Sequence, residues 1–277
     1  MQFFSSFIFN GALLLFSVRS GFNDLSGSLK SGEDFYIDVD FSNEPVARPL
    51  VSADDLLQMA LNAGMQSGDA SYNHLSNILN SPKLSGDLKM RTYTDLFSVL
   101  TAKNVDADSR ARLFESMDTK LNTKKSTIES YEGALAELRY INRLNFEGKV
   151  AQGSMIFTGV KKGQSIILKK GIVVDISPVH EGDILYLGID GKIYLEEVKR
   201  TPKTLLDKMR KTPMQLENMN TWRTTDVAGR EIGIKIENNE GLNNLFSTIE
   251  TKGTKTVADE IADRNVDIFV SGRKISW

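Results

Sequence analysis

The chain has 277 residues, of which 40% are hydrophobic and 25% charged, a balance typical of a soluble globular protein and unlike that of a collagen or a disordered chain. It contains no cysteine, which excludes a disulfide framework, a thiolate nucleophile and a cysteine-ligated zinc site. His74 and His180 are the only histidines, so a bound metal would rest mainly on carboxylates. Such ligands suit Mg²⁺, Mn²⁺ or Ca²⁺ better than zinc.

The net charge of −2 hides a difference between the two parts of the chain. Residues 1–120 carry 10 basic and 15 acidic side chains, whereas residues 121–277 carry 24 basic and 21 acidic ones. An acidic front and a mildly basic back are typical of two units with different partners. A chance partition of surface charge accounts equally well for a difference of this size.

The first segment is rich in phenylalanine, since 8 of the 14 phenylalanines fall within residues 3–41. Between Phe3 and Val18 the chain is mostly apolar, but it is shorter than the roughly 20 residues of a membrane-spanning helix. A secretory signal would start with basic residues, and none precedes Arg19. We expect a buried strand or helix here, with transient membrane contact as the alternative.

Residues 51–117 have the apolar spacing of helices. Ser52, followed by Asp54 and Asp55, predicts a helix start, because a serine side chain caps the first amides and acidic residues suit the first turn. The polar stretch 118–127 predicts a linker. We therefore expect a mostly helical N-terminal domain over 1–121 and a second domain over 122–277.

Residues 122–277 alternate between helix patterns and strand patterns, which predicts an α/β domain with a mixed sheet. We expect helices over 127–145, 201–222 (broken at Pro213) and 257–263, and strands over 165–168, 172–176, 183–187, 192–199, 230–236 and 266–270.

The stretch from Gly182 to Thr201 predicts a hairpin that turns at Asp190-Gly191. A two-residue loop would place Asp183 on the opposite face from Glu197. A three-residue loop, 189–191, with Gly191 in the left-handed conformation, would place Asp183 directly opposite Glu197. The period of two then adds Lys199 to the same face.

Two carboxylates at such a short distance repel each other unless a cation lies between them. Asp183 and Glu197 in this register supply hard oxygen ligands for a divalent ion, and Lys199 lies near enough to orient a water molecule. These are the parts that metal-assisted phosphodiester hydrolysis requires. In another register, Asp175 and Glu196 are the next candidates.

The motif Asp183…Glu197-Val198-Lys199 resembles that of the PD-(D/E)xK nuclease superfamily, which has an αβββαβ restriction-endonuclease-like core. The resemblance covers roughly residues 122–277 and implies a Mg²⁺- or Mn²⁺-dependent nuclease acting on DNA or on RNA such as tRNA. It also implies a carboxylate on the first helix, where Glu137 matches and Glu132 competes. Gln215 resembles a helix glutamine found near the site in several branches.

The helix that follows the hairpin in this family approaches the scissile phosphate. Between Lys199 and Lys211 the chain has six basic residues and one acidic residue, Asp207. Contacts of such residues with phosphates give affinity without sequence information. The candidate nucleic-acid-binding residues are Arg200, Lys203, Lys208, Arg210 and Lys211, and a solvated helix face is the alternative.

The order of an acidic N-terminal unit and a C-terminal nuclease resembles the toxic region of bacterial contact-dependent growth-inhibition effectors. In these effectors the first part mediates entry and the second is the nuclease. The resemblance implies secretion or cell-surface delivery, action in the target-cell cytoplasm, and a cognate immunity protein as partner. Two other classes stay open: a non-catalytic nucleic-acid or protein-binding module on the same fold, and a structural or adhesion fragment.

Overall fold

A computed structural model describes residues 4–9, 12–17, 51–161, 163–176, 182–212, 217–218, 221, 229–250 and 253–275. The chain divides into two compact units, Met1–Ala47 and Arg48–Trp277.

In the first unit, β1 (Phe4–Phe9) and β2 (Ala12–Ser17) form an antiparallel hairpin in which Phe4 pairs with Ser17 and Phe9 with Ala12. Of the two elements expected within the phenylalanine-rich segment, a buried strand or a helix, the structure shows strands, and their burial stays a prediction. Among the residues that the structure describes, no helix is both long and apolar enough to cross a membrane.

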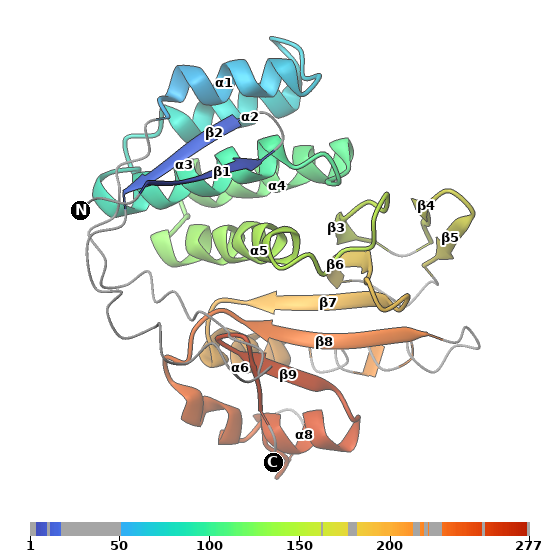
Figure 1. Cartoon of the computed structure of the whole chain (residues 1–277). Helices are drawn as coiled ribbons and strands as arrows, with labels where there is room; N and C mark the ends of the chain where they lie inside the picture. The colour runs from blue at the N-terminus through green and yellow to red at the C-terminus, as the bar shows by residue number, and fades with distance from the viewer. Residues whose placement is uncertain are drawn as a thin grey trace. The chain divides into compact units, whose positions relative to one another are not determined.

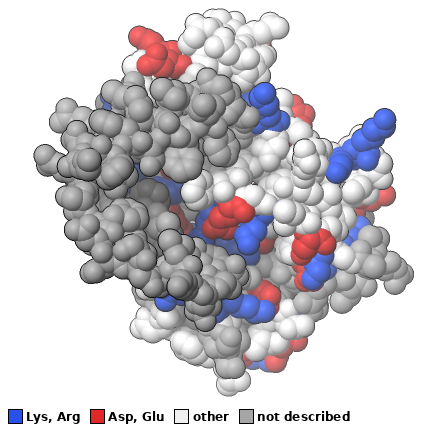
Figure 2. Space-filling model, in the orientation of Figure 1, with Lys and Arg blue, Asp and Glu red and all other residues white. Residues whose placement is uncertain are grey.

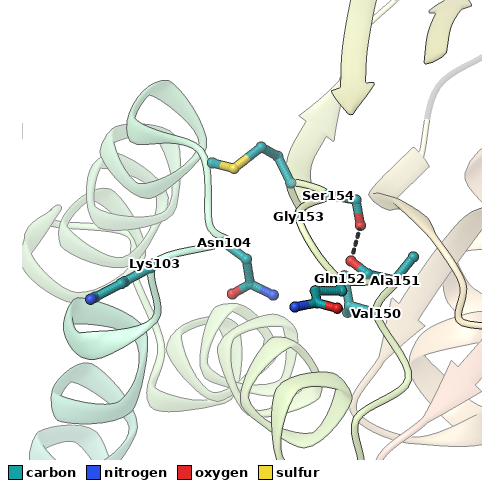
Figure 3. A pocket seen from close by; sticks show the side chains of 8 residues that line it. Lys103, Asn104, Val150, Ala151, Gln152, Gly153 and Ser154 are labelled. Atoms are coloured by element: carbon teal, nitrogen blue, oxygen red, sulfur yellow. Dashed lines mark hydrogen bonds between the residues drawn. The ribbon is translucent and has the colours of Figure 1, made fainter. Parts of the chain in front are cut away.

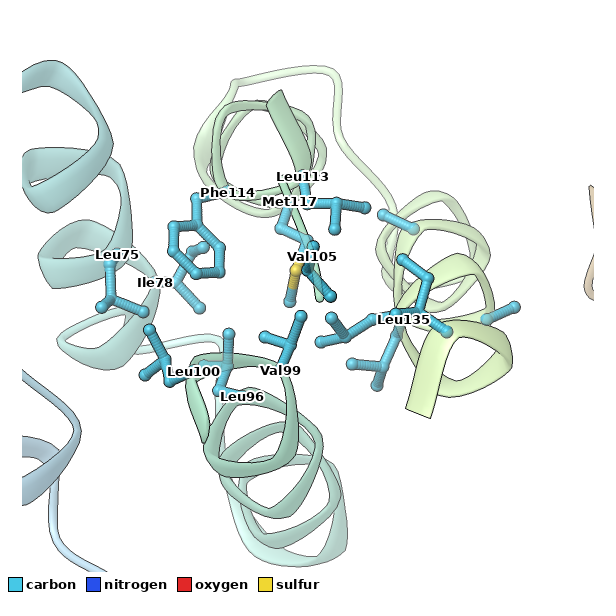
Figure 4. Packing of buried hydrophobic residues seen from close by; sticks show 14 of the residues in the cluster. Leu75, Ile78, Leu96, Val99, Leu100, Val105, Leu113, Phe114, Met117 and Leu135 are labelled. Atoms are coloured by element: carbon cyan, nitrogen blue, oxygen red, sulfur yellow. The ribbon is translucent and has the colours of Figure 1, made fainter. Parts of the chain in front are cut away.

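The second unit begins with helices, as the sequence predicts. They are α1 (Ala53–Asn62), α2 (Ala70–Leu79), α3 (Gly86–Thr101), α4 (Ala107–Asn122) and α5 (Ile128–Phe146). Ser52 caps α1 in a reciprocal arrangement with Asp55, and Thr127 caps α5. Figure 4 shows how Leu75, Phe114, Met117 and Leu135 from three of these helices fill one apolar interior.

The central sheet has the strand order β10-β9-β8-β7-β6-β3. β6 is antiparallel to both β3 and β7, whereas β7, β8 and β9 are parallel to one another. The sheet is therefore mixed, as predicted. The strands are β3 (Phe157–Val160), β6 (Gly182–Leu187), β7 (Ile193–Lys199), β8 (Arg230–Ile236), β9 (Asp267–Val270) and β10 (Arg273–Lys274).

The sheet separates two apolar cores (Figure 1). Ile184 and Val198 face α5 and the helices beyond it, whereas Leu185 and Leu195 face the opposite core. That second core includes residues of α6 (Pro202–Lys211), the 3-10 helix η2 (Leu242–Phe246) and α8 (Val257–Asp263). Because β6 and β7 are covered on both sides, their side chains are largely buried.

The sequence prediction missed β3. The predicted strands at 165–168 and 172–176 are confirmed as β4 (Ser165–Lys169) and β5 (Ile172–Asp175), which pair with each other in a separate two-stranded sheet. β3 takes the place beside β6. The backbone amide of Thr158 in β3 donates a hydrogen bond to the Ser109 hydroxyl of α4 at 3.0 Å.

Packing is continuous across the expected domain border at 121/122. α4 extends to Asn122, so the predicted linker is shortened to the residues between α4 and α5. Leu121 before the border and Leu138 after it belong to the same apolar core as Ile184 of β6. The compact unit therefore runs through this position and begins at Arg48 instead.

Candidate functional site

The hairpin of β6 and β7 has the three-residue loop, one of the two alternatives that the sequence allowed. Ile184 pairs with Glu196 and Leu187 with Ile193, and this register places Asp183 opposite Glu197. Gly191 has a φ of 80°, the left-handed conformation expected for it. The three-residue register is thus confirmed, and Lys199 joins Asp183 and Glu197 in one cluster.

The ammonium group of Lys199 lies among three oxygen atoms. It donates hydrogen bonds to Asp183 Oδ2 at 3.2 Å and to the Val198 carbonyl oxygen at 3.0 Å, and it pairs with the Glu197 carboxylate. The backbone amide of Val198 donates to the same Asp183 oxygen at 2.8 Å. Two carboxylates and a carbonyl therefore surround one cationic group.

Electrostatics favour the charged form of this lysine. Burial lowers the pKa of Lys199, but the nearby carboxylates of Asp183 and Glu197 outweigh burial and raise it above its ordinary value. The pair with Glu197 is nearly enclosed, because the lysine side chain is 13% exposed and the glutamate side chain 5%. The Asp183 side chain is more open to solvent.

Of the two helix glutamates, Glu137 lies within electrostatic reach of this cluster. Burial raises the pKa of Glu137 to about 8, repulsion from Asp183 adds to the increase, and the cations of Lys120 and Lys199 oppose it. Glu132 is instead engaged by two arginines, Arg91 at 3.3 Å and Arg200 at 2.8 Å.

The candidate phosphate-binding residues differ in their surroundings. Arg200 pairs with Glu132, and Arg210 donates a long 3.4 Å hydrogen bond to the Thr248 carbonyl oxygen. Lys203 and Lys211 are exposed on α6, and Lys208 is half-buried. Gln215 lies outside the described residues.

The alternative carboxylate pair is not brought together. Asp175 belongs to β5 in the separate small sheet and bonds to Ser165. Glu196 is buried on the other face of β7, where it accepts a hydrogen bond from Tyr140 of α5 and pairs with Lys235 of β8 at 3.1 Å.

A hollow of about 300 Å³ lies away from this cluster (Figure 3). Lys103, Asn104 and residues 150–155 line it, and in the figure the amides of Asn104 and Gln152 point toward each other. Its wall joins β6 at Leu187, whose carbonyl oxygen accepts from Ala151 at 2.9 Å. Asp183 is at the other end of that strand, so the hollow is separate from the carboxylate cluster.

Two features of the cluster were missed by reasoning from the sequence. One is Lys120 of α4, whose Nζ lies 3.7 Å from Glu137 Oε1. The other is the Val198 carbonyl group, which joins the oxygens around Lys199. No spacing along the chain indicates the first, because the two side chains meet through the packing of separate helices.

Within the described part of the chain, no three His, Cys, Asp or Glu side chains are grouped closely enough to hold a metal by themselves. The donor set at the hairpin is two carboxylates and a carbonyl oxygen. No protein-family model matches the chain, and a search of curated proteins gives no significant match.

Proposed function

We propose that this chain is a metal-dependent nuclease of the PD-(D/E)xK type. The observation that carries the proposal is that the hairpin brings Asp183, Glu197 and Lys199 together, with Glu137 of α5 within electrostatic reach. An acidic-x-Lys strand alone is common on exposed sheets. Here Glu197 and Lys199 are instead on a central, largely buried strand, where two carboxylates need a cation between them.

The order of elements supports the same class. α5, β3, β6, β7, α6 and β8 follow one another as helix, three strands, helix and strand, with the β4–β5 hairpin inserted. β3, β6, β7 and β8 are also neighbours in the sheet, the first three antiparallel and the last parallel. This order supports the αβββαβ arrangement implied by the motif.

The donor set suits Mg²⁺ or Mn²⁺. Asp183, Glu197 and the Val198 carbonyl oxygen already converge on the Lys199 ammonium, which acts as a stand-in for a cation. Mg²⁺ commonly takes one or two carboxylates and completes its shell with water and substrate phosphate oxygens. The ion would supply Lewis-acid activation of the phosphodiester.

The chain's own residues then have separate roles. Asp183 and Glu197 hold the ion, and Lys199, once released from them, orients the attacking water. Glu137 completes the carboxylate set from α5. Lys203, Lys208 and Lys211 on α6 offer contacts for the backbone of DNA or tRNA, and Arg200 does so where it is not held by Glu132.

Among the described residues visible in Figure 2, basic and acidic side chains lie side by side. Gln215 is a further candidate for positioning water or substrate.

More particularly, we propose that this nuclease is the toxic region of a contact-dependent growth-inhibition effector. The separation of a short first unit, Met1–Ala47, from the larger unit supports two roles along the chain. The producing bacterium would secrete or display the protein, the first unit would make transient membrane contact, and the nuclease would act in the target-cell cytoplasm. A cognate immunity protein would protect the producer.

Purified protein incubated with plasmid DNA and total tRNA, with Mg²⁺ or Mn²⁺ and with EDTA, tests the nuclease proposal. We expect cleavage by the wild type that EDTA stops and that Glu197→Ala and Lys199→Ala abolish. Lys192→Ala is the matched control, because it breaks an exposed pair with Glu231 on the same sheet. Binding without cleavage in any metal would select the non-catalytic module instead.

A further inference from the structure

Lys120 brings a second ammonium group to the carboxylate cluster from outside the predicted nuclease domain. It belongs to the last turns of α4, which packs against α5. Its Nζ lies 3.7 Å from Glu137 Oε1, and its side chain is 36% exposed. The group therefore lies beside Glu137 and is also open to solvent.

The geometry of this pair differs from that of the structural ion pairs on the same helix. Arg139 of α5 donates a hydrogen bond to Asp95 of α3 at 3.1 Å, and it also pairs with Glu237 after β8. The separation between Lys120 and Glu137 exceeds hydrogen-bond range. The carboxylate attracts the ammonium without clamping it, which leaves the lysine able to turn to another anion.

We propose that Lys120 is a substrate-binding residue that contacts a backbone phosphate of the nucleic acid next to the bond that is cleaved. This inference rests on the proposed nuclease function. It adds α4 to the functional unit, because a residue before the predicted domain border then takes part in substrate binding.

Charge balance at the cluster supports this role. Asp183 and Glu197, which would hold the ion, bring two negative charges, and Lys199 and Lys120 bring two positive ones. A divalent ion would change this sum from 0 to +2, which favours the negative charge of a phosphodiester. Without Lys120 the loaded site would have a charge of only +1, and its attraction for a phosphate would be weaker.

The test is the salt dependence of binding to a short fluorescein-labelled DNA duplex and to labelled tRNA, measured by anisotropy in Ca²⁺. Lys120→Met removes the charge and keeps the aliphatic stem, Lys120→Arg restores the charge, and Lys120→Gln serves if the first variant does not fold. Lys89→Ala is the control, because Lys89 is an exposed α3 lysine that lies over the Tyr93 ring. Substitution of a lysine that has a purely structural role would not change the number of counterions released when nucleic acid binds.

We expect Lys120→Met to weaken binding about tenfold at low salt, as for one lost charge-assisted hydrogen bond. The slope of log affinity against log salt should become shallower by about 0.9 on a duplex or about 0.7 on single strands. Lys120→Arg should restore both, and Lys89→Ala should change neither.

An unchanged slope in Lys120→Met, or an equal loss in Lys89→Ala, overturns the inference and leaves the nuclease proposal standing. Wild-type binding without cleavage in any metal overturns the nuclease proposal, whereas the slopes still decide the phosphate contact. If the wild type binds neither nucleic acid, both proposals fail.

Discussion

Replacing Lys199 by methionine tests whether its ammonium occupies a cation position. The substitution keeps the aliphatic length but leaves two carboxylates without their shared cation. Glu197 is the more affected partner, because its side chain is only 5% exposed and water cannot take over the role of the ammonium.

The size of the effect follows from the geometry. At 3.2 Å and an effective dielectric constant of about 20, the attraction between Lys199 and Asp183 is about 5 kcal/mol before the desolvation of either group is subtracted. Removing one partner of a buried pair lowers the free energy of unfolding by about 3–5 kcal/mol. For a unit of this size the melting temperature should fall by roughly 10 °C.

A divalent ion should reverse the loss. If Mg²⁺ takes the position of the ammonium, Lys199→Met gains about 2.7 kcal/mol when the ion is present at about 100 times its dissociation constant. We expect this gain to exceed that of the wild type, in which the ion must displace the lysine. Differential scanning fluorimetry over a Mg²⁺ series, started from EDTA, measures it.

Lys192→Met is the matched control, since it breaks an exposed lysine–glutamate pair with Glu231 on the same sheet. It should shift the melting temperature slightly and respond to Mg²⁺ as the wild type does. The reasoning is refuted if Lys199→Met destabilises no more than this control, or if Mg²⁺ stabilises both variants equally.

Three further outcomes are expected from the fold. Gly191→Val should lower the free energy of unfolding by about 1–3 kcal/mol and reduce Mg²⁺ binding, because valine is strained at a φ of 80° although the surrounding space is open. Gly191→Asn should lose less stability and less Mg²⁺ affinity in the same melting and titration experiments, and equal losses would contradict this. Burial, opposed by Arg139 and assisted by Glu237, raises the pKa of Asp95 to about 6 from 3.8. As the pH rises, Asp95 loses its proton in the unfolded state before it does so in the folded state, and the proton held by the folded state stabilises the fold. This contribution of Asp95 to stability is complete below about pH 3.8 and is lost as the pH rises through 6. Urea unfolding should show the wild type losing about 3 kcal/mol relative to Asp95→Asn between pH 4 and pH 7, and a pH-independent difference would refute the assignment. A fragment of residues 122–277 should show no cooperative thermal transition by circular dichroism, whereas 48–277 should, since the shorter fragment loses half of the helical core; cooperative melting of 122–277 would restore the border at 121/122.

Local signals were sufficient to predict the hairpin and the helix ends. Asp190-Gly191 between two apolar runs fixes the turn, but it allowed a two-residue or a three-residue loop, and the structure shows the three-residue one. Ser52 likewise marks the start of α1. In each case the residues that decide the structure are close together in the sequence.

The features that were missed depend on contacts between distant segments. β3 is four residues long and includes Gly159, so its strand propensity is weak, and its place in the sheet comes from pairing with β6 and from the support of α4. β4 and β5 have stronger strand patterns, yet they pair only with each other among the described strands. The approach of Lys120 to Glu137 is also tertiary, which is why the border at 121/122 cut through a shared core.

A crystal structure of the protein soaked in Mn²⁺, with anomalous diffraction data, tests the central claim most directly. We expect one strong anomalous peak within about 2.5 Å of the carboxylates of Asp183 and Glu197 and of the Val198 carbonyl oxygen, with the Lys199 ammonium displaced toward a water molecule. A hairpin with no peak between these groups, and with Lys199 still bound to both carboxylates, would contradict the assignment of this site as a metal-dependent catalytic centre.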